Sequence, residues 1–248
     1  MPLINLFIVG TQKGGTTALA EFLSAHSQVC LVQGKEAHVF DQHNIDTQTA
    51  SDIEDNYRKL LPHYTQQAIC CDATPLYMFF PDIPARLASY NPAAKIIVLL
   101  REPAERALSQ YQMEKRRGDE PFGFAQALIA ERHRLRQSAA PSAEKSAWRL
   151  HSYRQRGYYS RQLANIYQHF APEQVLVLRN SDLLYQHQPT LDRICQFLMI
   201  DSFISAPREV FAGRYQATLA ERVSLNLLRL CFWPETRRLK HQYGITFD

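Results

Sequence analysis

Short apolar runs rich in β-branched residues alternate along the chain with longer stretches whose apolar positions recur at helical spacing. This alternation is typical of βαβ units that build a parallel sheet. Several runs are apolar at nearly every position, as expected where helices cover both faces of a sheet. The pattern predicts strands at Ile4–Val9, Val29–Val32, Ala68–Cys71, Lys95–Leu100 and Gln174–Leu178.

The longer amphipathic stretches predict helices. The last is expected within Ala217–Trp233, because proline removes a backbone donor and Pro234 should therefore end it. Its apolar residues run nearly around the helix, so we expect them to be buried in the core. The other predicted helices are Thr16–Ala25, Asp52–Leu61, Ile83–Tyr90, Pro103–Arg117, Phe122–Arg136, Ser160–Phe170 and Gln188–Leu198.

The composition is that of an ordinary folded protein. The 248 residues are 46% hydrophobic and 21% charged, which excludes a disordered chain and allows a large core. We therefore predict a single α/β domain over residues 1–248, with a parallel central sheet flanked by helices. The net charge of +4 excludes the binding strategies of histone-like and strongly acidic proteins.

The five cysteines are odd in number and form no CxxC pair. This argues against a disulfide framework or a structural zinc site, so we expect buried free thiols and no bound metal. No run approaches the roughly 18 apolar residues of a membrane span, and Leu3–Val9 is too short for a signal-peptide core. We predict a cytoplasmic protein without a membrane span, unless an anchor precedes Met1. The oligomeric state is left open.

The stretch from Arg132 to Arg161 carries eight Lys and Arg residues against the single acid Glu144. Its Ser138–Ala143 part is typical of a flexible loop. Two interpretations stay open: a solvated helix face with a connector, or a mobile basic flap over an anionic ligand. Nucleic acid is a poor fit, because no aromatic residue is interleaved with these cations before Trp148 and the overall charge is small.

The most informative stretch runs from Ile8 to Leu19, where an apolar strand ends, glycines bracket a lysine, and a helix begins. In this arrangement backbone N–H groups and a helix N-terminus converge on an anion. Glycine allows the tight turn and the close approach of the backbone. The residues expected to bind are Lys13, Gly14, Gly15, Thr16 and Thr17, after the turn glycine Gly10.

This loop differs from the nucleoside-triphosphate loop GxxxxGK followed by Ser or Thr. Lys13 precedes the paired glycines instead of following them, and the strand that should end in a metal-holding acid runs into Arg101. Ser109, two turns into the next helix, can reach toward the same side. Two anion sites, one at each strand–helix junction, suit a nucleotide phosphorylated at two positions.

These residues resemble a known family, the sulfotransferases that use 3′-phosphoadenosine 5′-phosphosulfate (PAPS), in its heparan sulfate branch. Gln12-Lys-Gly-Gly-Thr-Thr17 looks like the 5′-phosphosulfate loop, and Val98-Leu-Leu-Arg-Glu-Pro-Ala-Glu-Arg-Ala-Leu-Ser-Gln-Tyr111 looks like the 3′-phosphate motif. Weaker matches are Lys35-Glu-Ala-His-Val-Phe-Asp41, Asp72-Ala-Thr-Pro-Leu-Tyr77, and Gly157-Tyr-Tyr-Ser160 leading to Val175–Leu183. The resemblance implies a P-loop-like phosphosulfate-binding loop on the predicted sheet.

The resemblance also implies the chemistry, a transfer of the sulfuryl group of PAPS to a hydroxyl, or less favourably an amine, with PAP as product. Glu36 stands at the position of the general base, and Lys13 would stabilise the charge that grows on the leaving phosphate. Lys35 would assist at the sulfuryl oxygens or the acceptor. His38, Asp41 and Thr74 fall on the acceptor side, where His38 and Asp41 would orient the hydroxyl and tune Glu36, so that His38 is also assigned to catalysis. His38 also fits a structural histidine, and Glu36 a surface carboxylate.

For the nucleotide, the resemblance assigns Thr16 and Thr17 to the 5′-phosphosulfate and Arg101 and Ser109 to the 3′-phosphate, where an arginine is a suitable bidentate partner. Two further positions complete the implied site. Tyr159 aligns with a tyrosine near the nucleotide but also fits a packing role, and Arg214 falls in a stretch similar to a late basic loop.

Two positions depart from the heparan-modifying pattern. Thr17 and Ala73 stand where those enzymes carry an arginine and a lysine. Losing two cations favours a smaller or less charged acceptor, such as a sugar, a lipid headgroup or a metabolite, although the basic stretch Arg132–Arg161 can restore charge elsewhere.

Two alternatives remain open, an atypical kinase that uses ATP and Mg²⁺, and an inactive nucleotide-binding relative. The order of the loop residues and Arg101 disfavour the kinase. The joint presence of Lys13, Glu36 and Arg101 disfavours a decayed site.

Overall fold

The computed structural model describes residues 3–138, 143–206 and 217–247. These fall into two compact units. Unit 1 comprises Met1–Leu100 with Leu163–Ala212, and unit 2 comprises Arg101–Gln162 with Gly213–Asp248. We describe each unit by itself, and the single domain over residues 1–248 stays a prediction.

Unit 1 contains a parallel sheet of five strands in the order β2-β3-β1-β4-β5. The predicted α/β fold with a parallel central sheet is confirmed, and each strand lies within two residues of its predicted bounds. The strands are β1 (Leu6–Gly10), β2 (Val29–Leu31), β3 (Ile69–Asp72), β4 (Lys95–Leu100) and β5 (Val175–Arg179).

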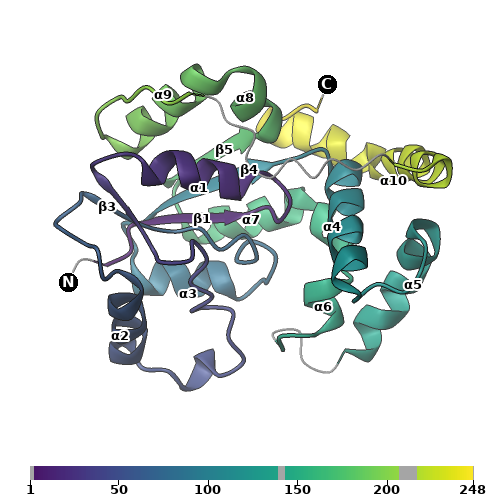
Figure 1. Ribbon diagram of the computed structural model, residues 1–248, viewed down its shortest axis with the longest axis horizontal. Coiled ribbons are helices and arrows are strands. Elements are labelled where there is room, and N and C mark those ends of the chain that lie inside the picture. Colours follow the sequence, from purple (N-terminus) through teal and green to yellow (C-terminus); the bar gives the residue numbers. More distant parts are fainter. Residues whose placement is uncertain (1–2, 139–142, 207–216, 248) are drawn as a thin grey trace. The chain divides into compact units, whose positions relative to one another are not determined.

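Helices cover both faces of this sheet, which is why its strands are apolar at nearly every position. On one face, α1, α8 and α9 pack against side chains such as Ile8, Ile97 and Leu178 (Figure 1). The helices of unit 1 are α1 (Thr16–Ser24), α2 (Ala50–Leu60), α3 (Ile83–Tyr90), α8 (Asn180–Tyr185), α9 (His187–Leu198) and the part of α7 (Tyr159–His169) from Leu163 onward, with short 3₁₀ helices at Ile45–Thr47 and Pro172–Gln174.

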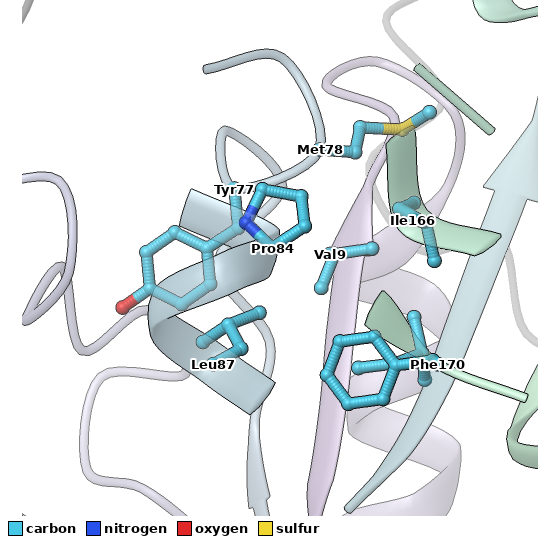
Figure 2. A pocket seen from close by; sticks show the side chains of 8 residues that line it. Val9, Tyr77, Met78, Pro84, Leu87, Ile166 and Phe170 are labelled. Atoms are coloured by element: carbon cyan, nitrogen blue, oxygen red, sulfur yellow. The ribbon is translucent and has the colours of Figure 1, made fainter. Parts of the chain in front are cut away.

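On the opposite face, α3 and α7 pack over Val9 and Ile96. Figure 2 shows a small niche there between Pro84 and Leu87 of α3, Ile166 of α7, and Phe170, which directly follows α7. Its lining is apolar, so we assign it to packing rather than to ligand binding.

β1 is the central strand, with β3 on one side and β4 on the other. The chain therefore continues from β1 in opposite directions along the sheet. In open parallel sheets such a reversal leaves a crevice at the carboxyl ends of the strands, where ligands bind. The glycine-rich loop that follows β1 begins at this edge.

Unit 2 is helical. Apolar residues of α4, α5 and α10, among them Tyr111, Phe124 and Phe232, form its core. α4 has the bounds predicted for it, with Glu102 as N-cap, Pro103 in the first turn and Gly118 in a left-handed C-cap. The helices are α4 (Pro103–Arg117), α5 (Phe124–Gln137), α6 (Ala147–Leu150) and α10 (Leu219–Tyr243), with a 3₁₀ helix at Gln155–Gly157 and the first turn of α7.

Two expectations about the last helix are wrong. α10 does not end at Pro234 but continues to Tyr243. Pro234 has no N–H to donate to the Leu230 carbonyl, but both residues lie on the exposed side of the helix, where water can replace this hydrogen bond. The buried Phe232 and Leu239 hold the helix in place before and after the proline. Core burial holds for only one face, because Leu227, Leu230 and Trp233 are exposed, as is Cys231.

In the described part of the chain, no helix combines the length and the apolar character needed to cross a membrane.

The buried face of α10 should carry much of the stability of unit 2. Phe232→Ala removes a side chain that is 1% exposed and should lower the free energy of unfolding by about 3–5 kcal/mol. Leu230→Ala on the exposed face should change it by less than about 0.5 kcal/mol. Urea unfolding of both variants measures the difference, and equal losses would contradict this assignment of faces.

Candidate active site

The glycine-rich loop between β1 and α1 is held by a backbone contact to β4 and by a contact within the loop. Thr11 N–H donates to the Leu99 carbonyl at 2.9 Å, and Gly14 N–H donates to the Thr11 carbonyl at 2.8 Å. A Cβ on Gly14 would lie 2.4 Å from the Leu99 oxygen, and Gly15 has a φ of 98°. Glycine is therefore required at both positions by packing and backbone conformation.

Asn180 is a residue of this site that the sequence analysis missed. Its Nδ2 donates to the Gly14 carbonyl at 3.0 Å from the start of α8. A Cβ on Gly15 would meet the same amide at 2.4 Å. The signal was available, because Asn180 directly follows β5 and so lies at the carboxyl edge of the sheet.

The N-terminus of α1 is suited to an anion. Its N-cap, Gly15, has no side chain to cap the first N–H groups, and the first turn of α1 contains no acidic residue. The amide dipoles and the N–H groups of Thr16 and Thr17 therefore favour a negative ligand.

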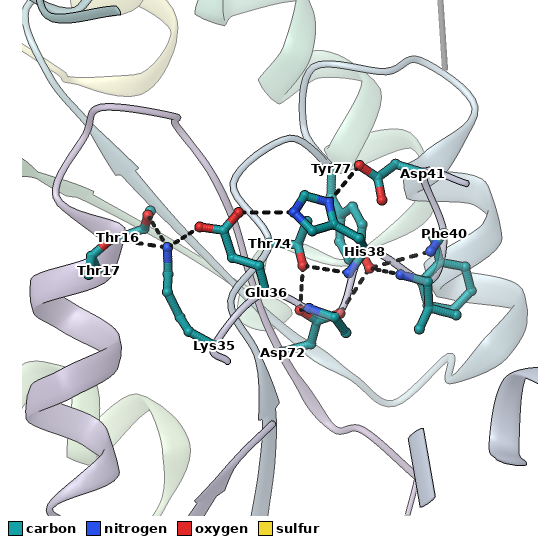
Figure 3. Close-up of polar contacts among 12 residues, drawn as sticks. Thr16, Thr17, Lys35, Glu36, His38, Phe40, Asp41, Asp72, Thr74 and Tyr77 are labelled. Atoms are coloured by element: carbon teal, nitrogen blue, oxygen red, sulfur yellow. Dashed lines mark hydrogen bonds and ion pairs between the residues drawn. The ribbon is translucent and has the colours of Figure 1, made fainter. Parts of the chain in front are cut away.

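Next to this helix, Lys35 joins the loop to the candidate base. Its Nζ lies 2.6 Å from Glu36 Oε1 and donates to Thr17 Oγ1 at 3.1 Å and to Thr16 Oγ1 at 3.4 Å (Figure 3). Lys35 is only 14% exposed. The sequence placed these four residues in two separate motifs, and the fold brings them into one network.

His38 holds the other oxygen of the carboxylate. Its Nε2 lies 3.1 Å from Glu36 Oε2, and its Nδ1 lies 2.9 Å from Oδ2 of the buried Asp41. Figure 3 shows the imidazole between the two carboxylates. Asp41 thus contacts His38 directly, which makes it a partner of the histidine.

Three of these side chains depend on an uncommon backbone conformation. Among the described residues, five non-glycine residues have a positive φ, and they include Lys13 (70°), Lys35 (74°) and His38 (50°). Such a conformation is costly for a residue with a Cβ and persists only where the surroundings impose it. Its concentration here indicates that the loops are shaped for the placement of these groups.

The ion pairs fix the charges of the site. Burial alone would raise the pKa of Glu36, but the hydrogen bonds from His38 and Lys35 and their charges outweigh it, and the pKa is lowered. Burial would lower the pKa of His38, but Asp41 and Glu36 raise it to about 9. At neutral pH the site therefore contains an ionised Glu36 between two cations.

The sequence analysis also missed Asp72, a buried carboxylate at the end of β3. Asp72 supports the loop of residues 35–41, which we call the site loop. Asp72 Oδ2 accepts hydrogen bonds from the hydroxyls of Tyr57 and Tyr77, both at 2.9 Å, and Oδ1 accepts from Thr74 at 2.6 Å. Asp72 Oδ1 also accepts from the N–H of Ala37 at 3.3 Å. Burial raises the pKa of Asp72, against the opposing effect of these hydrogen bonds.

Thr74 and Tyr77 pass this support on to the site loop. The N–H of His38 donates to Thr74 Oγ1 at 3.3 Å, and the N–H of Val39 donates to Tyr77 Oη at 3.0 Å. Thr74 is fully buried. Its hydroxyl therefore acts on the site by holding the His38 backbone.

The residues expected at the 3′-phosphate lie in unit 2. Arg101 directly follows β4, and its guanidinium donates to Glu105 Oε2 at 3.3 Å. The hydroxyl of the buried Tyr159 donates to the Arg101 carbonyl at 2.9 Å, so its contribution runs through the backbone of Arg101. Ser109 is a buried residue of α4. Arg214 lies outside the described residues.

The described part of the basic stretch Arg132–Arg161 contains more internal contacts than either interpretation assumed. Arg134 forms a bidentate contact with the buried Glu120, at 2.6 and 3.0 Å. Buried Glu131 accepts hydrogen bonds from the N–H groups of Arg154 and Gln155, and Arg156 is itself buried. Several of its cations therefore stabilise unit 2 internally.

Comparison with known proteins identifies the family. The family model described as "Sulfotransferase domain" matches residues 3–210. The chain belongs to the sulfotransferase family. Human heparan sulfate glucosamine 3-O-sulfotransferase 3B1 is 32% identical over 204 residues, which are 82% of this chain and 48% of that protein. Mouse heparan sulfate glucosamine 3-O-sulfotransferase 5 is 37% identical over 109 residues, 44% of this chain and 30% of that protein.

A solved relative supports the same family. A sulfotransferase from Alicyclobacillus acidocaldarius has a TM-score of 0.79 and 26% identity, with 98% of this chain and 97% of that chain covered. The curated human relative is about twice as long as the part matched here. The resemblance stated from the motifs is therefore confirmed at the level of the sulfotransferase family.

The Asp72 network should be essential for stability. Asp72→Asn should lower the free energy of unfolding by about 1–3 kcal/mol, because an amide cannot accept all of these hydrogen bonds and leaves buried donors unsatisfied. Urea unfolding measures the loss. Asp201→Asn, at an exposed carboxylate, is the matched control and should stay within about 0.5 kcal/mol. Equal effects of the two substitutions would refute the role of Asp72.

The protonation of His38 should follow its two carboxylate partners. In the wild type its imidazole should titrate at about pH 9, and in Glu36→Gln its pKa should fall, because one stabilising negative charge is lost. NMR titration of the imidazole resonances measures both values.

The same shift sets the sign of the pH dependence of stability. Because folding raises the pKa of His38, its stabilising contribution is present below about pH 6.5, the value in the unfolded chain, and is lost as the pH rises to about 9. A His38 titration midpoint near pH 6.5 in both the wild type and Glu36→Gln would contradict the assignment of these ion pairs.

Proposed function

We propose that the protein is a PAPS-dependent sulfotransferase that transfers a sulfuryl group to an acceptor hydroxyl, with Glu36 as the general base. The observation that carries the proposal is the position of the ionised Glu36. It lies between Lys35 and His38, and Lys35 also contacts Thr16 and Thr17 at the N-terminus of α1.

The donor set fits a phosphosulfate. Lys13, the N–H groups at the start of α1 and the Thr16 and Thr17 hydroxyls are cations and donors, which oxyanions require. PAPS would supply the sulfuryl group and leave as PAP. Arg101 and Ser109 are assigned to the 3′-phosphate, with Tyr159 supporting Arg101 through its backbone, and Arg214 stays a prediction.

Lys35 links donor binding at Thr16 and Thr17 to proton acceptance by Glu36. Its ammonium lowers the pKa of Glu36, which keeps the carboxylate ionised but makes it a weak base. A negative ligand at Thr16 and Thr17 would compete for this ammonium and weaken its hold on Glu36. The basicity of Glu36 would then rise when the donor is bound, which is when a proton acceptor is needed.

His38 and Asp41 orient the base. His38 holds Oε2 of Glu36, and Asp41 fixes the ring from its other side. The imidazolium would also stabilise the negative charge that Glu36 carries before it accepts the proton. Both residues therefore act on the reaction through Glu36.

The acceptor is proposed to carry less charge than heparan sulfate, the substrate named for the human and mouse relatives. Ala73 is fully buried and provides no cation. Thr17 is a neutral side chain bonded to Lys35. A hydroxyl of a sugar, lipid headgroup or small metabolite fits a site without these two cations.

Donor binding and turnover test the proposal together. PAP at about 100 times its dissociation constant should stabilise the protein by roughly 2.7 kcal/mol, a rise in melting temperature of about 5–10 °C. Glu36→Gln should keep this shift, while transfer from PAPS to a panel of hydroxyl acceptors falls by about 10²–10⁴-fold. Glu21→Gln, at an exposed carboxylate of α1, is the matched control and should retain both the thermal shift with PAP and the transfer activity.

Two further outcomes separate the alternatives. Arg101→Ala should lose affinity for PAP but not for adenosine 5′-phosphosulfate, which lacks the 3′-phosphate. A thermal shift with ATP and Mg²⁺ alone would instead favour a kinase. Donor binding without turnover on any acceptor would favour an inactive relative.

A further inference from the structure

The outer face of α10 carries a row of exposed apolar side chains. The described residues of the chain leave this face uncovered, although the opposite face is buried through Leu228, Phe232 and Leu239. The row, which we call the outer stripe, consists of Leu219 (80% exposed), Val223 (54%), Leu227 (59%), Leu230 (71%) and Trp233 (59%).

The outer stripe forms one continuous face. Its members follow one another at intervals of four, four, three and three residues. At 3.6 residues per turn these intervals keep the side chains on one side of the helix. Pro234 and Cys231 extend the same face and are also exposed. α10 is therefore apolar on two opposite sides, and the core of unit 2 uses only one of them.

The charges beside the outer stripe are almost all positive. The acids of α10 are already used within the protein. Glu221 closes the capping box with Thr218, and Glu235 is buried, where it accepts hydrogen bonds from Ser160. Two exposed cations of α10 pair with acids, Arg229 with Glu102 and Glu105 of unit 2 and Arg238 with Glu235. The other exposed cations of this helix are Arg222, Arg237 and Lys240.

We propose that the outer stripe binds an anionic membrane surface, with α10 lying in the plane of the lipid headgroups. Its leucines and valine would enter the boundary of the acyl chains, while the arginines contact anionic headgroups. Trp233 suits the interface, because its ring is apolar with one polar edge and the guanidinium of Arg237 lies 5.4 Å from its centre. The cations along α10 place it on the surface rather than across it.

A second copy of the chain fits this face less well. A twofold contact through the outer stripe would bring identical surfaces together, so that arginines of one α10 face arginines of the other. The acids of α10 are the capping Glu221 and the buried Glu235. Glu102 and Glu105, which precede and begin α4, are already paired with Arg229. Like charges at an interface oppose association. Charge complementarity therefore selects an anionic surface as the occupant.

Co-sedimentation of the full chain with vesicles tests the proposal. The wild type should bind vesicles of phosphatidylcholine mixed with phosphatidylserine, bind phosphatidylcholine alone weakly, and lose affinity as salt rises. Leu227→Ser combined with Leu230→Ser should reduce partitioning by about tenfold or more. Ile129→Ser on α5, a residue 79% exposed, is the matched control and should bind like the wild type.

A charge variant separates the two components. Arg237→Glu combined with Lys240→Glu, at exposed cations of α10, should remove the preference for phosphatidylserine. Arg132→Glu combined with Arg136→Glu, at exposed cations of α5, should leave it unchanged. Unfolding curves confirm that the variants are folded, and the substituted residues are exposed, so their stability should match the wild type.

Three outcomes would overturn the proposal. In the first, the wild type binds no vesicles. In the second, the Leu227/Leu230 variant binds vesicles as well as the wild type does. In the third, the wild type forms a concentration-dependent dimer without binding vesicles, and the Leu227/Leu230 variant is monomeric. The last, measured by light scattering, would assign the outer stripe to self-association.

Discussion

The buried carboxylate of Asp72 is the constraint on which the site depends. A charged group without solvent must be satisfied by hydrogen bonds, and Asp72 obtains them from Tyr57, Tyr77, Thr74 and the Ala37 amide. Two of these donors, Thr74 and Tyr77, in turn hold the backbone of residues 38 and 39. Moving the site loop would leave several buried groups unpaired, so the uncommon backbone conformations of Lys35 and His38 persist.

On this support, alternating charges define the chemistry. Lys35, Glu36, His38 and Asp41 form a row in which each charge lies beside its opposite. The arrangement keeps a carboxylate ionised and oriented at the helix terminus that suits an anion. In the proposed reaction, Glu36 would become a stronger base when a bound anion takes up the ammonium of Lys35. Donor binding and proton acceptance are thereby linked in the proposed reaction.

In unit 2, several charged side chains bind one another and the backbone within the unit. Glu120 and Glu131 are buried and bind Arg134 and the backbone of Arg154 and Gln155. Part of the basic stretch is therefore structural. Other cations, such as Arg237 and Lys240 of α10, lie beside exposed apolar residues. This combination of positive charge and apolar surface distinguishes the outer face of α10 from the rest of the unit.

The sequence by itself determined the parallel sheet, most helix bounds and the chemical types at the anion-binding loop, because apolar periodicity, glycine positions and motif order are local features. It missed Asp72 and Asn180, whose roles arise from contacts with residues distant in the chain. It also could not decide which face of α10 is buried, since an all-round apolar pattern names no side. The prediction that the helix ends at Pro234 failed for a similar reason. The hydrogen bond that the proline removes lies on the exposed side of α10, so the helix continues, and only the packing decides which side is exposed. Tertiary structure alone joined Lys35, Glu36 and His38 to Thr16 and Thr17, because a side chain's charge and partners depend on what the fold brings within a few ångströms.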